Sequence, residues 1–375
     1  MDIKEITDLR RRLHREPEVS NSEHDTAAYI TSFMERFNPS LVLEIASTGR
    51  AFVFEGDAPG PTVMFRAELD ALPISEETGL EYSSSREGVM HACGHDGHMS
   101  ILVGLASLIA ADRPKKGRVV LLFQPAEEVE QGARDVVNDP AFKTIEPDFI
   151  FALHNMPGYK RGEALLRHDT FAAASRALVV KLRGRTSHAG EPEKGISPAL
   201  AVARIVQGTA EMMRDEGLFE DVAFLTVVYI KVGEPSAGTT PGYGEMMMTL
   251  RSYLDSDMER LTERTERLVR TIADDENLQA IMSWEEIFPA VVNSREAVDI
   301  AEKAATDAGI AVRHLEAPNR WSEDFAYFTA KYKGAIFGLG AGEAHPPLHD
   351  PKYDFPDELI EPGAEIFYNI YKSLL

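Results

Sequence analysis

The 375-residue sequence has a single cysteine, no signal-peptide pattern and no apolar run long enough to cross a bilayer. One cysteine cannot form an internal disulfide, which fits a reducing compartment. The longest uncharged apolar run, Met99 to Ala111, is shorter than the about 20 residues that a membrane-spanning helix requires. The N-terminus is charged throughout and lacks the apolar core of a secretion signal. These absences predict a soluble, cytoplasmic protein.

Basic residues are also scarce, with 39 lysines and arginines against 61 aspartates and glutamates, for a net charge of −22. A field of this sign repels phosphate backbones and anionic lipids, so we expect neither nucleic-acid nor membrane partners. The apolar fraction of 44% is ordinary for a globular protein, and 375 residues exceed what one compact core organises. We therefore expect two domains.

The two ends of the chain predict one α/β domain. The first 37 residues indicate two helices separated by "REPEVSNSE", where Ser20 and Glu23 have capping-box spacing. Strands are then expected at 41–45, 51–56, 62–70, 117–128, 148–155 and 334–342, and helices at 98–111 and from Glu361 onward. Alternating strands and helices are typical of an α/β layer domain with a parallel or mixed sheet.

The middle of the chain has a different order of elements. Strands are expected at 176–184, 222–233, 245–254 and 279–288, with helices at 197–213 and 257–273. This β-α-β-β-α-β order is the ferredoxin-like α+β arrangement. We therefore expect an α/β domain of residues 1–174 and 289–375, interrupted by an α+β domain of residues 175–288.

The only cysteine lies among histidines in "GVMHACGHDGHMS" (88–100). A thiolate at Cys93 and an imidazole at His95 are good ligands for zinc and similar divalent ions. Cys93 could instead be a core residue, as free cysteines often are. A turn crowded with polar imidazoles is a poor place for a core thiol, so metal binding is favoured.

Further polar groups follow predicted strands of the same domain. Glu127 and Glu128 end "FQPAEE", where one carboxylate could bind metal and the other could take a proton from water. His154 ends "DFIFALHN", and His345 and His349 lie in "AHPPLHDPKYDF". Each of these is by itself better explained as a solvated turn or a structural histidine. Their joint occurrence after strands of one domain favours a metallohydrolase site.

These residues stand in segments that resemble the metal-dependent N-acyl-amino-acid amidohydrolases of the aminoacylase and carboxypeptidase superfamily. That group includes hippurate hydrolases, auxin-conjugate hydrolases and N-acetyldiaminopimelate deacetylases. The resemblance spans the chain and is carried by "LRRRLHREPEVS", "RAELDALPISEETGL", "GVMHACGHDGHMS", "FQPAEE", "SEDFAYF" and "PLHDPKYDF". It implies a metallopeptidase-like catalytic domain with an inserted lid that forms a homodimer.

The resemblance also implies roles for individual residues. Cys93 would bridge two divalent ions, manganese or zinc with cobalt or nickel as alternatives, and Glu127 would be the general base and acid acting through a metal-bridging water. The remaining ligands would be His95, Glu128, His154 and His349. His91 and His98 would bind no metal, and His345 would be a loop residue.

In the lid, the resemblance implies that His188 reaches the partner subunit's site to stabilise the oxyanion, and that Arg251 holds the substrate carboxylate. The sequence departs from the family at three places. Gly238 replaces an asparagine that would hydrogen-bond the substrate or the oxyanion, and Glu68 replaces an aspartate. Arg320 and Trp321 stand where a small residue is usual, which bears on the shape of the substrate pocket.

The predicted function is hydrolysis of the amide of an N-acyl amino acid, releasing a carboxylic acid and the amino acid. One alternative keeps the chemistry and changes the substrate, as in a dipeptidase or carboxypeptidase. Another is a catalytically silent protein that binds metal or ligand, which the missing asparagine at Gly238 favours slightly. Retention of every residue that the metal chemistry requires argues against the silent protein.

Overall fold

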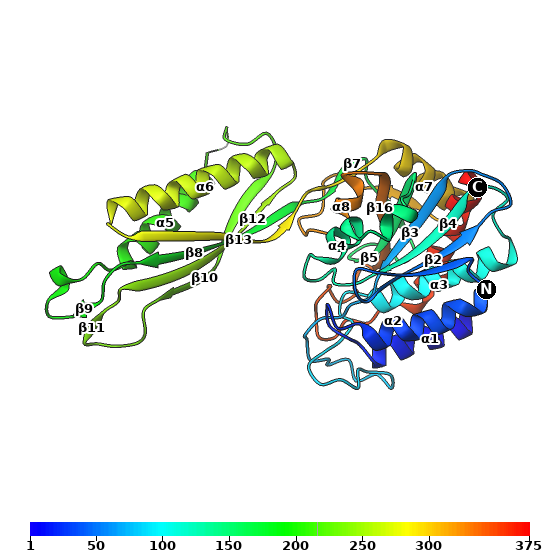
Figure 1. Ribbon diagram of the computed structural model, residues 1–375, viewed down its shortest axis with the longest axis horizontal. Coiled ribbons are helices and arrows are strands. Elements are labelled where there is room, and N and C mark those ends of the chain that lie inside the picture. The colour runs from blue at the N-terminus through cyan, green and yellow to red at the C-terminus, as the bar shows by residue number, and fades with distance from the viewer. Residues whose placement is uncertain (216) are drawn as a thin grey trace. The chain divides into compact units, whose positions relative to one another are not determined.

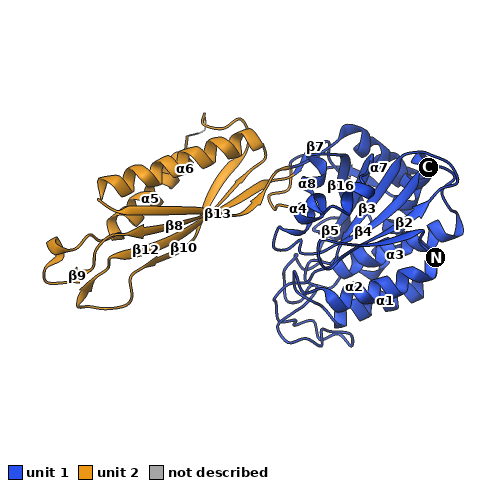
Figure 2. Ribbon diagram, in the orientation of Figure 1, with its two compact units in different colours: residues 1–171, 291–317, 323–375 blue, residues 172–290, 318–322 orange. Residues whose placement is uncertain are grey.

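The computed structural model describes residues 1–215 and 217–375, which form two compact units (Figure 2). Unit 1 comprises residues 1–171, 291–317 and 323–375, and unit 2 comprises residues 172–290 and 318–322. The segment 318–322 was not expected in the second unit. It belongs there because the Ala173 amide donates hydrogen bonds of 3.1 Å to the carbonyls of Asn319 and Trp321.

Unit 1 is built on an eight-stranded mixed sheet of order β1-β2-β4-β3-β5-β16-β6-β15. The strands are β1 (Leu41–Ile45), β2 (Gly49–Glu55), β3 (Thr62–Glu68), β4 (Arg118–Gln124), β5 (Phe149–Pro157), β6 (Ala164–Leu166), β15 (Val312–His314) and β16 (Lys333–Gly342). The central strands β4, β3, β5 and β16 are parallel, and β1 and β2 continue the sheet in antiparallel pairing. Every residue of β3 is buried, including the charged residues Arg66 and Glu68.

Helices cover this sheet and enclose the main core. They are α1 (Ile3–Arg15), α2 (His24–Met34), α3 (His95–Ala111), α4 (Gly132–Asn138), α7 (Arg295–Asp307), α8 (Ala326–Thr329) and α9 (Ile360–Leu374). Helices α3 and α9 pack on β3, α7 packs on β16, and α1 packs on α3 (Figure 1). Alternate strand residues such as Phe52, Phe54, Val63 and Phe65 fill the core beneath them. Among the described residues, no helix combines the length and apolarity needed to span a membrane.

Short elements complete unit 1. They are η1 (Glu35–Phe37), η2 (Phe142–Thr144), η4 (Asp357–Leu359) and the paired strands β7 (Asp169–Ala172) and β14 (Val291–Asn293). The predicted α/β class with a mixed sheet is confirmed.

The predicted capping box is wrong. Helix α2 begins at His24, and the side chain of its N-cap residue, Glu23, makes no capping hydrogen bond. Instead, Ser20 Oγ donates to Asp70 Oδ2 at 2.7 Å, and Glu23 Oε1 accepts the Ala126 amide at 2.8 Å. Both side chains therefore bind segments that follow strands of the sheet, and Glu23 Oε1 also accepts the nearby Asn21 amide at 3.0 Å.

Unit 2 contains a four-stranded antiparallel sheet of order β10-β12-β8-β13. Its elements follow the predicted β-α-β-β-α-β order: β8 (Ala174–Arg183), α5 (Ala199–Met212), β10 (Ala223–Val232), β12 (Tyr243–Ser252), α6 (Asp255–Asp275) and β13 (Gln279–Phe288). The two helices pack on one face, over Leu178, Val180, Met246 and Met248. A short pair, β9 (Ser187–His188) and β11 (Thr239–Thr240), and η3 (Pro192–Lys194) complete the unit.

Candidate metal centre

The residue between Cys93 and His95 determines how this turn is built. Gly94 adopts φ 90°, in the left-handed region, immediately before α3 begins at His95. A Cβ at this position would overlap Nδ2 of Asn155 and lie 2.8 Å from the hydroxyl oxygen of Tyr353. Only glycine lets the turn approach β5 closely enough to place Cys93 and His95 beside His154.

The other ligand candidates follow from the parallel strands. Strands β4 and β5 both run parallel to β3, so their carboxyl ends meet at one edge of the sheet. Glu127 and Glu128 follow β4 after Ala126, whose φ of 51° turns the chain sharply, and His154 lies in the last part of β5. The Cys93–His95 turn, the segment after β4 and the end of β5 are far apart in sequence, and they lie close together at this edge of the sheet.

Two groups of ligand-type side chains share the same sulfur atom. Cys93, His95 and His154 form one group, and Cys93, Glu128 and His349 form the other, with donor atoms within 4.8 Å of one another in each. Cys93 Sγ lies 3.4 Å from His154 Nε2, and His349 Nε2 lies 3.5 Å from Glu128 Oε2. These two groups contain all five predicted ligands, and Cys93 is common to both.

Hydrogen bonds to backbone carbonyls fix the rings of His95 and His154 through Nδ1. His95 Nδ1 donates to the Asp70 carbonyl at 2.8 Å, and His154 Nδ1 donates to the Asn155 carbonyl at 2.7 Å. Because a carbonyl oxygen only accepts, these contacts place a proton on Nδ1 of each ring, so Nε2 is the nitrogen through which each ring could bind a metal. In the described part of the chain, buried His95 Nε2 and Glu128 Oε1 have no hydrogen-bond partner. Such orphaned acceptors fit a bound cation.

The pKa values of the ligand side chains indicate that the cluster favours a bound positive charge. Burial, and then the charges of Glu128 and Glu127, raise the pKa of the Cys93 thiol, and burial raises the pKa of Glu128 to about 7. Burial opposes charge on His95, yet Glu68 and Asp70 outweigh it and raise its pKa to about 10. A cation at the cluster would favour the ionised thiolate and carboxylate that bind it. The donor set therefore fits two divalent ions.

Glu127 stands beside these groups rather than within them. It is 8% exposed, and its Oε2 lies 3.9 Å from His95 Nε2. Burial raises its pKa, and the neighbouring carboxylates, Glu323 foremost, raise it further. A buried carboxylate with elevated proton affinity, next to the ligand cluster, has the properties of a general base.

The other histidines of residues 88–100 and 344–355 lie outside the two groups that share Cys93. His98 donates from Nδ1 to Glu68 at 2.7 Å and accepts the Asn155 amide at Nε2 (3.0 Å), so both its nitrogens are used. His91 is buried, and neither ring nitrogen has a hydrogen-bond partner among residues 1–215 and 217–375. His345 is half-buried, with its ring 5.2 Å from that of Tyr353.

The two predicted lid residues belong to unit 2, so the cluster in unit 1 is built without them. His188 is exposed on β9, and its Nδ1 accepts the Gly190 amide at 3.0 Å. Arg251 on β12 donates from Nη1 to Ser322 Oγ (2.8 Å) and to the Arg320 carbonyl (3.1 Å). At Gly238, a side chain would meet no atom within 4 Å, so the structure does not require glycine there.

Asp70 is a site residue to which the sequence analysis gives no role. It is fully buried, its carbonyl holds His95, and its Oδ2 accepts the Glu128 amide at 2.9 Å. It lies two residues after β3, so the reasoning that placed Glu127, Glu128 and His154 at the ends of strands applies equally to "RAELD".

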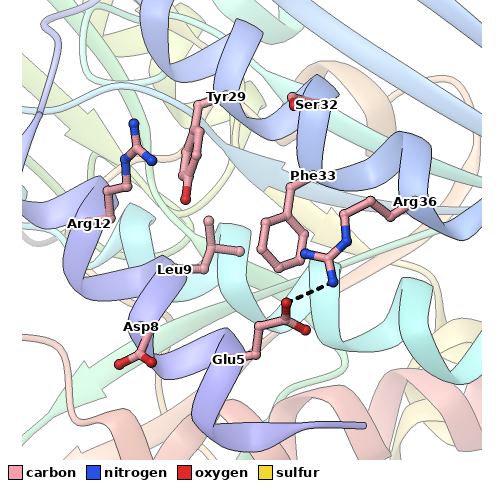
Figure 3. Close-up of a pocket in the computed structure, with 8 residues that line it drawn as sticks. All are labelled: Glu5, Asp8, Leu9, Arg12, Tyr29, Ser32, Phe33 and Arg36. Carbon is pink, nitrogen blue, oxygen red and sulfur yellow. Dashed lines mark hydrogen bonds and ion pairs between the residues drawn. The ribbon is translucent and has the colours of Figure 1, made fainter.

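A surface hollow between α1 and α2 lies outside this cluster (Figure 3). It is lined by Glu5, Asp8, Leu9, Arg12, Tyr29, Ser32, Phe33 and Arg36. Arg36 pairs with Glu5 at 2.7 Å, and none of the eight lining residues belongs to the ligand groups described above.

Comparison with known proteins gives consistent matches. The model of Peptidase family M20/M25/M40 matches residues 64–373. An N-acetyldiaminopimelate deacetylase of Listeria monocytogenes is 30% identical over 99% of this chain and 100% of its own length. An N-acetyl-L-cysteine deacetylase of Bacillus subtilis is 29% identical, covering 99% and 88%. The crystal structure of Bacillus subtilis YXEP, described as a dinuclear metal-binding peptidase, has a TM-score of 0.85 at 27% identity, covering 99% and 98%.

Proposed function

The chain belongs to Peptidase family M20/M25/M40, and from this premise we propose the chemistry of its cluster. It is a metal-dependent amidohydrolase that cleaves the amide of an N-acyl amino acid, releasing a carboxylic acid and an amino acid. The observation that carries this function is the pair of ligand groups that share Cys93. Curated relatives that deacetylate N-acetyl amino acids support acetyl compounds as the first substrates to test.

We propose that Cys93, which both ligand groups share, would hold two divalent ions together with His95, Glu128, His154 and His349. When bound, the ions supply Lewis acidity to the scissile carbonyl and lower the pKa of water. Thiolate, imidazole and carboxylate ligands suit manganese or zinc, with cobalt or nickel as alternatives.

Glu127 is the proposed proton carrier. Its carboxylate takes a proton from the attacking water and returns it to the amide nitrogen as the carbon–nitrogen bond breaks. Its burial and the like charge of Glu323 raise its proton affinity, which suits both halves of this transfer.

We further propose that unit 2 supplies substrate contacts and a homodimer interface. Arg251, whose Nη1 is fixed by Ser322, holds the substrate carboxylate, and His188 of the partner subunit stabilises the oxyanion. The edge strand β10 exposes Val228, Tyr229 and Ile230, by 55%, 41% and 46%. An exposed apolar edge of this kind is suited to pairing with a second copy.

Replacing Glu127 by glutamine tests the function, because the change removes the proton carrier and leaves the ligands in place. Bound metal should stay at two ions per chain, while kcat on N-acetyl amino acids should fall at least 100-fold. Glu365→Gln, an exposed change on α9, is the matched control. Unchanged turnover in Glu127→Gln would refute the role of Glu127. Comparing acetyl- and aminoacyl-amino acids in the same assay separates an acylase from a dipeptidase.

A further inference from the structure

The segment from His14 to Glu23, which comprises the end of α1 and the connection to α2, contains polar side chains that the proposed chemistry leaves unused. His14 and Glu23 are fully buried, whereas Arg15, Glu16 and Asn21 are exposed. The backbone of this segment is also attached to the sheet. Val19 forms a parallel bridge with Ala71, and the Ala71 amide donates to the Glu18 carbonyl at 2.8 Å. The segment therefore runs beside the residues that follow β3.

Ser20 acts on two proposed ligands through one aspartate. Its hydroxyl donates to Asp70 Oδ2 at 2.7 Å, and the same oxygen accepts the Glu128 amide at 2.9 Å. The Asp70 carbonyl accepts from His95 Nδ1 at 2.8 Å. Ser20 thus fixes the side chain of a residue that orients the ring of His95 and the backbone of Glu128.

Glu23 supports the turn that carries Glu127 and Glu128. Its Oε1 accepts the Ala126 amide at 2.8 Å, and its Oε2 accepts the Thr48 hydroxyl at 2.8 Å. Ala126 has φ 51°, a conformation that costs energy for any residue with a side chain. The carboxylate of Glu23 is therefore placed to hold a strained turn in the shape that directs Glu127 and Glu128 toward the cluster.

His14 provides a third attachment, at the start of α3. Its Nδ1 donates to Asp96 Oδ2 at 2.8 Å, and Asp96 Oδ1 accepts the Gly97 amide at 3.0 Å. Asp96 directly follows His95. The three side chains thus reach the segments after β3, after β4 and at the start of α3, which together supply His95 and Glu128 of the five proposed ligands.

We propose that residues 14–23 are a positioning segment for the metal centre, with Ser20 and Glu23 setting the geometry of His95 and of the Glu127–Glu128 turn. The inference rests on the proposed metal chemistry and assigns to this segment a role beyond joining two helices. Its residues touch neither metal nor substrate. Loss of such supporting contacts typically weakens metal affinity by about 10- to 100-fold.

The first test is Ser20→Ala, with cobalt(II) as the probe. The matched control is Ser107→Ala, since Ser107 is also half-buried and loses one Oγ hydrogen bond, of 2.8 Å to the Gly104 carbonyl. We expect cobalt affinity, measured by competition with a chelator, to fall about 10-fold or more in Ser20→Ala. The visible absorption of bound cobalt should also shift, because it reports coordination geometry. Ser107→Ala should match the wild type in both.

The second test is Glu23→Gln, which keeps the shape of the side chain but weakens its acceptor. Its control is Asp257→Asn, another buried carboxylate that accepts two backbone amides, at 2.9 Å, in unit 2. Wild-type affinity and spectrum in Ser20→Ala and in folded Glu23→Gln would overturn the inference. If Glu23→Gln fails to fold, Ser20→Ala alone decides. A wild-type chain that binds no cobalt would instead overturn the proposed function itself.

Discussion

At the scale of single residues, the metal centre depends on Gly94, which contributes no ligand atom. Gly94 allows the Cys93–His95 turn to lie against Asn155 and Tyr353, and the Asn155 side chain donates to the Cys93 carbonyl at 2.6 Å. The hydroxyl of Tyr353 in turn donates to Asn155. Backbone conformation and close packing therefore locate the sulfur before any metal binds.

We predict that Gly94→Ala loses metal binding, because a Cβ would push the turn away from Asn155. Gly79→Ala is the matched control, since Gly79 also has positive φ (70°) but has open space around it. Both changes should destabilise the fold by about 1 kcal/mol or more through the backbone alone. Only Gly94→Ala should reduce the metal content measured by elemental analysis, and equal metal content in the two variants would contradict this packing.

Most ligand candidates could be predicted at this scale, but their supporting residues could not. Cys93, Glu128 and His154 stand in recognisable motifs or at strand ends. Asn155 and Tyr353 matter because of hydrogen bonds across 62 and 198 positions of sequence, which no local pattern reveals. The roles of His188 and Arg251 remain proposals.

At the scale of elements, α1 stabilises the start of α3 through a buried ion pair. Burial opposes charge on His14, but its hydrogen bonds to Asp96 and Glu76 outweigh this and the repulsion from Arg10, raising its pKa to about 9. The histidine is therefore protonated in the folded protein at neutral pH.

A raised pKa in the folded state implies stability that is lost in alkali. The contribution of His14 should be complete below pH about 6.5, its unfolded value, and lost as pH rises through about 9. The difference corresponds to about 3 kcal/mol. Urea unfolding of wild type and His14→Gln across this range should show the two converging toward high pH. A constant difference between them would contradict the assignment.

The elements themselves could be predicted unevenly. The bounds of β13, an edge strand of unit 2, are predicted correctly at 279 and 288. Helix α7 was not predicted, because its buried face is mostly alanine and gives a weak apolar stripe. The capping box failed because Ser20 and Glu23 have partners far along the chain.

At the scale of the whole molecule, the proposed dimer is tested through β10. Ile230→Glu places a charge on its exposed apolar edge and should convert a dimer to a monomer in light scattering after size exclusion. Val292→Glu, at a residue 45% exposed in unit 1, is the control and should leave the mass unchanged. Identical masses for wild type and Ile230→Glu would exclude β10 as the interface.

The central claim is that one sulfur joins two divalent ions, and the direct measurement is metal stoichiometry in Cys93→Ala. Wild type and variant are stripped with a chelator, reloaded with the same metal, desalted and submitted to elemental analysis alongside amino-acid quantification. We predict two ions per wild-type chain and fewer than one in Cys93→Ala, since both ligand groups lose their common atom. Two ions per chain in the folded variant would contradict a shared sulfur.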